Sequence, residues 1–387
     1  MSDTDVGVDV GAGKLAVIAC GGTGGHLTPG IALAEALRER GANSLLLTSR
    51  KSIDKRLLEK YPRLETLPAP GSGFSVRPAG FAKFLLNTLR GFLFARRLLR
   101  ERRPSVFVSF GGFLTTGPAL AFWLAGVPVV FHEANRVPGK AVRFLKKLAT
   151  QIWLPPDVGM RGLREGVLCH AGFPVREEIK PLPKVEARRA LGLPETGTLL
   201  LVTGGSQGAA VLNNWVRENL DAFAAAGAHV LCITGPGKEA ADSATADGAT
   251  ADGVAEADGA VAAEVVPVVK FVPFCDKMAE ALSAADVVVA RAGAGSIAEF
   301  AACAVPSVLV PLPNAKDNHQ DANARYLESL GGCSVVSQTQ PAALTAEVLR
   351  LLADSAAREK QRDILRGLRP RFAWEPLPAA VAKLLEK

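Results

Sequence analysis

The sequence predicts an α/β fold of two domains, each built on a parallel sheet that is covered on both faces. From Leu15 onward, short apolar stretches alternate with amphipathic ones, and strands that are apolar throughout are typical of parallel sheets buried beneath helices. The chain has 387 residues, 48% hydrophobic and 21% charged, which suits a globular protein of two domains. Both halves contain a strand that runs into a glycine loop and then a helix, so we expect the halves to resemble each other.

The expected elements follow one another in strand–helix order. In the first half we expect strands at 15–20, 44–48, 106–110 and 127–131, and helices at 31–41 and 118–125. In the second half we expect strands at 198–203, 229–234, 286–290 and 306–311, and helices at 209–220 and 296–304. A proline- and charge-rich segment at 173–197 suits a linker between the halves, with the boundary expected near 173–183. We therefore expect an acidic N-terminus (1–13), domains at 14–175 and 176–365, and a low-complexity surface loop at 239–263.

The stretch 104–131 carries no charge and is long enough to cross a bilayer. Its several glycines and prolines instead favour a strand, a glycine loop, a short helix and a second strand. The N-terminus is acidic where a signal peptide would be basic, so secretion is not expected. Six cysteines without a CxxC pair indicate reduced thiols.

Positive charge is concentrated in the first half of the chain. Residues 1–180 carry 26 basic and 14 acidic side chains, against 19 and 24 in the remainder. Such an excess favours phosphate-bearing partners. The segment 81–103 has apolar residues at helical spacing before a cluster of arginines, so it predicts either a core-facing helix or an amphipathic element on an anionic membrane. The number of apolar side chains favours the membrane. Residues of this segment, together with Trp123, form a candidate docking surface that we call the basic–apolar surface. It consists of Phe81, Phe84, Leu85, Phe92, Leu93, Arg96, Arg97 and Trp123.

Three glycine loops, at 21–30, 204–209 and 291–296, follow strands and precede helices. Glycine lets the backbone approach a ligand, and the helix start offers N–H groups to a phosphate. No GxxxxGK[ST] motif is present, which excludes P-loop phosphotransfer, and Gly11-x-Gly13-x-x-Ala16 precedes its strand and so does not fit a dinucleotide site.

Ionisable residues flank these loops. His26 is expected at the mouth of the first loop, before a helix that Thr28 caps and Pro29 begins, either as a polar turn residue or as a general base. Ser296-x-x-Glu299 fits a capping box, although Glu299 could also bind ribose hydroxyls. Polar groups at 132–140 and 316–327 follow strands, where open α/β sheets bind ligands.

Taken together, the motifs GGTGGHLTPG, FGGF, HEANRVPGK, GFPVR, TGGSQGA, RAGAGSIAE and KDNHQDANA resemble the MurG family of N-acetylglucosaminyltransferases. The resemblance runs from about Leu15 to Leu330. It implies the GT-B fold, two Rossmann-like domains facing a cleft, and a C-terminal helix (366–387) that returns to the N-terminal domain. The implied reaction is inverting transfer of N-acetylglucosamine from UDP-N-acetylglucosamine to the muramoyl 4-hydroxyl of lipid I, giving lipid II and UDP.

The resemblance also implies residue roles. The general base would be His26 or Glu133. Substrate contacts would come from Thr23, Gly24, Gly25, Asn135, Arg176, Ser206, Cys275, Ala294, Gly295, Ser296, Glu299 and Gln320. His319 replaces a glutamine found in some members of the family, which bears on recognition of the donor's hydroxyls.

No metal and no cofactor is expected, because backbone N–H groups and Arg176 can stabilise the leaving diphosphate. The expected partners are the two substrates, an anionic membrane surface and other cell-wall synthesis proteins, but no nucleic acid. The implied location is the cytoplasmic face of the plasma membrane, as a peripheral protein. The alternatives are another GT-B enzyme, such as a glycolipid glycosyltransferase or a UDP-N-acetylglucosamine 2-epimerase, and a non-catalytic nucleotide-sugar-binding protein.

Overall fold

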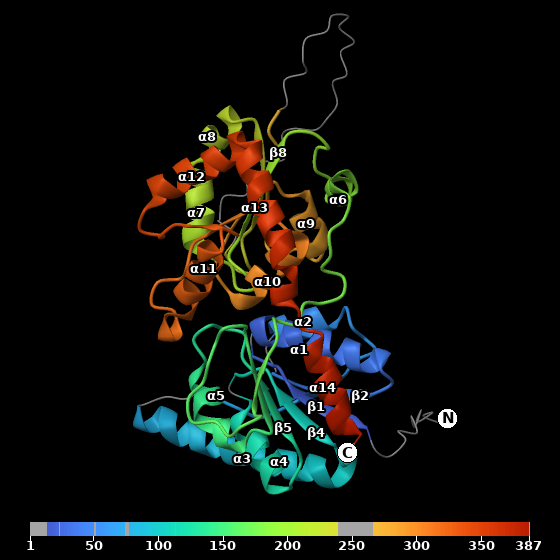
Figure 1. The fold of residues 1–387 in the computed structure, drawn as a ribbon. Coiled ribbons are helices and arrows are strands. Elements are labelled where there is room, and N and C mark those ends of the chain that lie inside the picture. The colour runs from blue at the N-terminus through green and yellow to red at the C-terminus, as the bar shows by residue number, and fades with distance from the viewer. Residues whose placement is uncertain are drawn as a thin grey trace, which may run out of the picture. The chain divides into compact units, whose positions relative to one another are not determined.

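The computed structural model describes residues 14–22, 24–49, 52–73, 77–112, 114–238 and 266–386. The chain divides into two units (Figure 1): unit 1 comprises Met1–Ala134, Pro138–Arg176 and Ala373–Lys387, and unit 2 comprises Asn135–Val137 and Glu177–Phe372. The acidic N-terminus at 1–13 and the predicted loop at 239–263 lie outside the described residues.

Unit 1 is built on a parallel sheet whose described strands have the order β3-β2-β1-β4-β5-β6-β7. They are β1 (Leu15–Ala19), β2 (Asn43–Thr48), β3 (Glu65–Pro68), β4 (Val106–Ser109), β5 (Val129–His132), β6 (Gln151–Leu154) and β7 (Leu168–His170). The strand order reverses between β1 and β4, which is the topological switch point of a Rossmann-like sheet.

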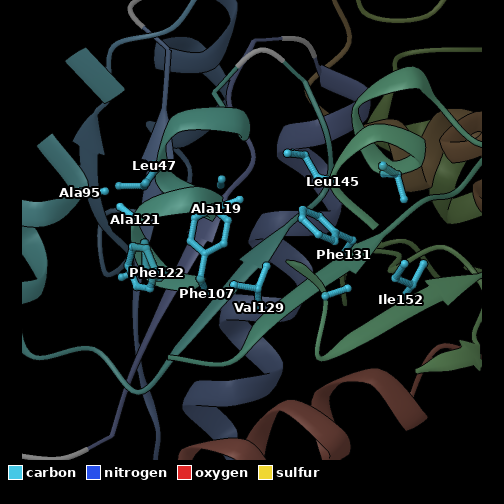
Figure 2. Packing of buried hydrophobic residues seen from close by; sticks show 14 of the residues in the cluster. Leu47, Ala95, Phe107, Ala119, Ala121, Phe122, Val129, Phe131, Leu145 and Ile152 are labelled. Atoms are coloured by element: carbon cyan, nitrogen blue, oxygen red, sulfur yellow. The ribbon is translucent and has the colours of Figure 1, made fainter. Parts of the chain in front are cut away.

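Helices cover both faces of this sheet. They are α1 (Gly24–Glu39), α2 (Ser52–Leu58), α3 (Pro78–Arg102), α4 (Thr116–Leu124), α5 (Lys140–Leu145), the 3-10 turn η1 (Lys146–Leu148) and α14 (Pro376–Leu385). Alternate residues of β1 enter opposite cores, with Val17 in the cluster of α3 and α4 and Ile18 in the cluster of α1 and α14. Phe107 and Phe122, whose ring centroids are 4.8 Å apart, lie in the first cluster (Figure 2). This two-sided burial explains why the strands are apolar throughout.

The uncharged stretch 104–131 forms β4, α4 and β5, as its glycines and prolines predict. Among the described residues, no helix is both long enough and apolar enough to cross a membrane.

The chain ends in unit 1. Leu377 and Val381 of α14 are fully buried in the cluster that contains Ile18 and Leu33, and α14 lies beside α1 (Figure 1). The expected single helix over 366–387 is wrong at its start, because α13 (Ser355–Leu368) extends past residue 366. Proline at 370 and at 376 separates the two helices, since proline cannot continue a helical hydrogen-bond pattern.

Unit 2 repeats the architecture. Its described strands are parallel in the order β10-β9-β8-β11-β12-β13, and the switch point lies between β8 and β11. They are β8 (Thr198–Thr203), β9 (Ala228–Ile233), β10 (Val269–Val272), β11 (Val287–Ala290), β12 (Ser307–Leu309) and β13 (Ser334–Val335).

The remaining helices belong to unit 2. They are α6 (Lys184–Ala190), α7 (Ala210–Glu218), α8 (Leu220–Ala225), α9 (Met278–Ala284), α10 (Ala294–Cys303), η2 (Lys316–Asn318), α11 (His319–Ser329), α12 (Pro341–Ala353), α13 and η3 (Arg369–Phe372). A buried ion pair holds α6 near the start of β11, because Arg188 Nη2 donates to Asp286 Oδ2 over 3.0 Å. Arg188 also donates to the carbonyls of Pro194, Glu195 and Thr196, which satisfies the buried guanidinium.

Candidate functional site

The first candidate site lies at the switch point of unit 1, where β1 and β4 end side by side. His26, in the first turn of α1, lies against the glycine pair that follows β4. A Cβ atom on Gly112 would lie 3.3 Å from His26 Nδ1, and one on Gly111 would lie 3.6 Å from Nε2. Gly111 has a φ of 92° and Gly112 a φ of 81°, and such positive values strongly favour glycine. Gly111 and Gly112 of the FGGF motif therefore form the surface on which the imidazole rests, a role that the spacing of the motif did not reveal.

The expected start of α1 is wrong. The helix begins at Gly24, so Gly25 and His26 are helical and Pro29 lies inside the helix. Thr28 does not cap the helix, because its hydroxyl donates to the Gly24 carbonyl over 3.0 Å. Thr23 lies outside the described residues.

Two ionisable residues follow one another at the end of β5. His132 is 2% exposed, and its Nε2 lies 3.0 Å from the Gly172 carbonyl oxygen. Burial lowers the pKa of His132 to about 4, so the ring is neutral at pH 7 and donates through Nε2. Glu133 is half-buried, and its Oε2 accepts the Gly139 N–H over 2.8 Å. One oxygen of this candidate base therefore closes the loop between β5 and α5.

Asn135 and Arg136 are grouped with unit 2, where Asn323 of α11 holds them. Asn323 is 4% exposed. Its Nδ2 donates to Asn135 Oδ1 over 3.0 Å and to the Ala292 carbonyl over 3.3 Å, and its Oδ1 accepts the Arg136 N–H over 3.0 Å. The Arg136 guanidinium also lies 3.4 Å from the centroid of the Tyr326 ring. Sequence reasoning singled out the segment that contains Asn323 but gave this residue no role.

The second candidate site lies at the switch point of unit 2, where β8 and β11 end. After β8, Ser206 is exposed in a turn whose Gly208 N–H donates to the Gly205 carbonyl over 2.9 Å. Gly208 has a φ of 65°, and a Cβ atom there would lie 1.9 Å from the Thr234 carbonyl oxygen. The close packing of these loops therefore requires glycine and leaves Ser206 at the surface.

After β11, the capping-box prediction is wrong. The N-cap of α10 is Gly293, and Ala294, Gly295 and Ser296 form the first turn. The N–H groups of such a turn have no acceptor within their own helix, so they can bind an anion. Glu299 lies in the second turn and is half-buried.

Arg291 orders the strand ends around this turn. It is 8% exposed, its Nη1 donates to the Val310 carbonyl over 3.0 Å, and its Nη2 donates to Gln338 Oε1 over 2.8 Å. Gln320, in the first turn of α11, accepts the Leu312 N–H through Oε1 over 2.9 Å. This bond engages the Gln320 oxygen, and the amide nitrogen is a hydrogen-bond donor.

Two predicted contact residues lie elsewhere. Cys275 is half-buried in the loop between β10 and α9. Arg176 is grouped with unit 1 and is 8% exposed, and its Nη1 donates to the Tyr61 hydroxyl over 3.4 Å. Across the described ranges, no group of three or more His, Cys, Asp or Glu side chains is placed to hold a metal ion.

Comparison with known proteins assigns both halves of the chain. Residues 16–154 match the glycosyltransferase family 28 N-terminal domain, and residues 199–367 match the family 28 C-terminal domain. The chain is 45% identical over 352 residues to the UDP-N-acetylglucosamine–N-acetylmuramyl-(pentapeptide) pyrophosphoryl-undecaprenol N-acetylglucosamine transferase of Opitutus terrae. The match covers 91% of this chain and 90% of the relative. It is 31% identical to the transferase of the same name from Protochlamydia amoebophila, over 92% of each chain.

Solved structures share the fold. The chain resembles Acinetobacter baumannii MurG with a TM-score of 0.65 and 23% identity, over 96% of this chain and 99% of that one. A glycosyltransferase of kitacinnamycin gives a TM-score of 0.66 at 20% identity, over 97% and 99%. These neighbours and the two Rossmann-like units confirm the predicted GT-B fold.

Proposed function

Because the chain belongs to glycosyltransferase family 28, we propose that it transfers N-acetylglucosamine from UDP-N-acetylglucosamine to lipid I and releases lipid II and UDP. The observation that carries this proposal is a glycine-bearing turn and a helix start at the switch point of both sheets. Open α/β sheets bind ligands at these points, and the reaction has two substrates that each carry a diphosphate.

The donor binds to unit 2 in this proposal. The N–H groups of Ala294, Gly295 and Ser296 receive the diphosphate of UDP, and the partial positive charge at the start of α10 stabilises the charge that grows as UDP leaves. Glu299 accepts the ribose hydroxyls in this proposal.

This proposal includes further donor contacts. Ser206 and Arg176 contact the uridine diphosphate, and Cys275 lies beside the uracil. Asn135 and the amide nitrogen of Gln320 bind the sugar, because amides suit both its hydroxyls and its acetamido group.

His26 acts as the general base. It accepts the proton of the muramoyl 4-hydroxyl as that oxygen attacks the anomeric carbon, and UDP leaves from the opposite face, so the configuration inverts. His26 is favoured over Glu133 because one Glu133 oxygen already accepts the Gly139 N–H, whereas the His26 ring lies on a glycine surface at the switch point. His26→Ala should lower kcat by about 10²–10⁴-fold with little change in UDP affinity. His170→Ala, at an exposed histidine of the same unit, is the matched control.

The activity is tested by measuring UDP release from UDP-N-acetylglucosamine with and without a lipid I analogue, in excess EDTA. Release that requires the acceptor and survives EDTA is the expected result. Release without acceptor would indicate an epimerase or hydrolase instead, and UDP binding without any release would indicate a binding protein.

The basic–apolar surface docks the enzyme on an anionic membrane in this proposal, at the cytoplasmic face where lipid I is made available. Leu85, Leu89 and Leu93 of α3 are 51%, 54% and 58% exposed, and Trp123 of α4 is 46% exposed, so this helix face is not core. The core side of α3 consists of Gly91, Ala95 and Leu98, and Phe92 packs partly against that core. Arginines 96 and 97 are exposed beside these residues, a composition that suits acidic headgroups.

Replacing Leu85, Leu89 and Leu93 together with serine should release the protein from vesicles that contain acidic phospholipid, while UDP affinity stays unchanged. Leu312→Ser, at a 43% exposed leucine of unit 2, is the control that should leave vesicle binding intact. Retained binding of the triple variant would exclude this surface as the anchor.

A further inference from the structure

A buried carboxylate holds together the two loops that follow β1 and β2. Asp54 of α2 is fully buried. Its Oδ2 accepts the Gly22 N–H over 2.9 Å, the Ser49 N–H over 3.1 Å and the Ser49 hydroxyl over 2.6 Å. One oxygen therefore accepts three hydrogen bonds from two loops. Hydrogen bonds to a charged acceptor are about twice as strong as those between neutral groups.

These loops also pack backbone against backbone. The Cys20 and Gly21 N–H groups both donate to the Leu47 carbonyl over 3.1 Å. A Cβ atom on Gly21 would lie 2.2 Å from the Ser49 nitrogen, so glycine is required for this approach. Gly22 has a φ of 119°, a conformation that only glycine adopts readily, and the bond to Asp54 fixes the direction of its N–H.

The same loop leads directly into the candidate active site. Gly22 precedes the start of α1 by two residues and His26 by four. On its other side the loop touches the glycine pair after β4, since a Cβ atom on Gly112 would lie 3.3 Å from both the Gly21 carbonyl oxygen and His26 Nδ1. A shift of this loop would therefore displace both the imidazole and the backbone on which it rests.

The second carboxylate oxygen has a different environment. Asp54 Oδ1 is buried and has no hydrogen-bond partner among the described residues, and a buried polar atom without a partner costs stability. Departures from full hydrogen bonding are found mainly at functional sites.

We infer that Asp54 is a positioning residue for the transfer reaction: its carboxylate holds the loop after β1 and, through it, His26, without touching either substrate. This inference rests on the proposed function. It predicts that loss of the Asp54 carboxylate acts on the chemical step and the acceptor, and leaves the UDP-binding unit unaffected.

The test compares Asp54→Asn with Leu154→Ala, a buried residue of β6 in the same unit, three strands away from β1. For each protein kcat, both KM values, UDP affinity and Tm are measured, with activity assayed well below Tm. Asp54→Asn should lower kcat by about 10–100-fold, because a misplacement of about 1 Å can cost 10²-fold. Its donor KM and UDP affinity should stay within about twofold of wild type. Leu154→Ala should lower Tm by at least as much and keep kcat.

A second variant guards against a failure of Asp54→Asn to fold. Ser49→Ala removes one of the three donors, and kcat should fall by about 3–10-fold with Tm nearly unchanged. If both variants lower kcat no more than Leu154→Ala does, the carboxylate is only structural and the inference is overturned while the proposed function stands. A wild-type protein without acceptor-dependent UDP release would overturn the proposed function, and the inference with it.

Discussion

Acidification should destabilise unit 1 through His132. This histidine is 2% exposed beside Phe110, with ring centroids 5.3 Å apart, and its Nε2 lies 3.0 Å from the Gly172 carbonyl oxygen. Burial lowers its pKa from 6.5 to about 4, so the folded protein binds this proton less readily than the unfolded chain does. Stability is therefore complete above pH 6.5 and is lost as the pH falls towards 4.

The size of the effect follows from the shift. One pKa unit corresponds to about 1.4 kcal/mol, so the full shift corresponds to about 3 kcal/mol. Between about pH 7 and about pH 4.5 the free energy of unfolding should fall by about 2.5 kcal/mol from this group alone. His229 of unit 2 also has a pKa that burial lowers, so it adds to the pH dependence of the whole protein in the same direction.

His132→Gln isolates the contribution of His132, because glutamine can donate to the Gly172 carbonyl but does not titrate. Urea unfolding of both proteins is measured at several pH values, with the fluorescence of Trp153 as the probe. Trp153 pairs in register with His132, and the other tryptophans are replaced by phenylalanine. The difference in unfolding free energy should shift by about 2.5 kcal/mol in favour of the variant on acidification. A difference that stays constant over this range would refute the assignment of a neutral, buried imidazole.

Three further perturbations have defined outcomes. Gly112→Ala places a Cβ atom 3.3 Å from His26 Nδ1, at a residue whose φ is 81°. Steady-state kinetics should therefore show kcat reduced by about 10²-fold with UDP affinity unchanged. A normal kcat would remove the glycine surface from the mechanism. Asp286→Ala leaves the Arg188 guanidinium buried without its partner carboxylate, so the free energy of urea unfolding of unit 2 should fall by about 3–5 kcal/mol. A fall of less than about 1 kcal/mol would show that the backbone carbonyls alone satisfy the buried guanidinium. Leu377→Ala empties a fully buried position of α14 and should cost about 2–5 kcal/mol in the unfolding of unit 1, whereas a loss confined to unit 2 would contradict the packing of α14.

Local rules failed at the two helix starts that matter most for the site. Thr28-Pro29 and Ser296-x-x-Glu299 both predict a start several residues later than the structure has it. In each case the helix begins within or directly after the glycines, at Gly24 and at Ala294. Before α1 the chain turns at Gly22, whose φ of 119° favours glycine, whereas Gly293 precedes α10 in an ordinary extended conformation. In both places the helix begins before the capping side chain is reached.

The alternation of apolar and amphipathic stretches was sufficient to predict the α/β class, the two halves and the strands at 15–20, 106–110, 198–203 and 286–290. These elements are periodic and apolar, so burial alone determines them. The strand Glu65–Pro68 was not predicted, because it lies at the edge of its sheet and is mostly exposed. Its residues therefore carry no apolar pattern.

The pattern of residues thus predicts the fold class, the glycine-rich turns and the family. Which residues meet follows from the folded chain: His26 lies against Gly111 and Gly112, Asn323 bonds to Asn135, and Asp54 bonds to Gly22 and Ser49. Except for Ser49 and Asp54, which are close in the sequence, these contacts join residues that are about 30 to 190 positions apart along the chain. Parallel strands bring their carboxyl ends to one edge regardless of sequence distance, and no local spacing encodes which loops become neighbours there.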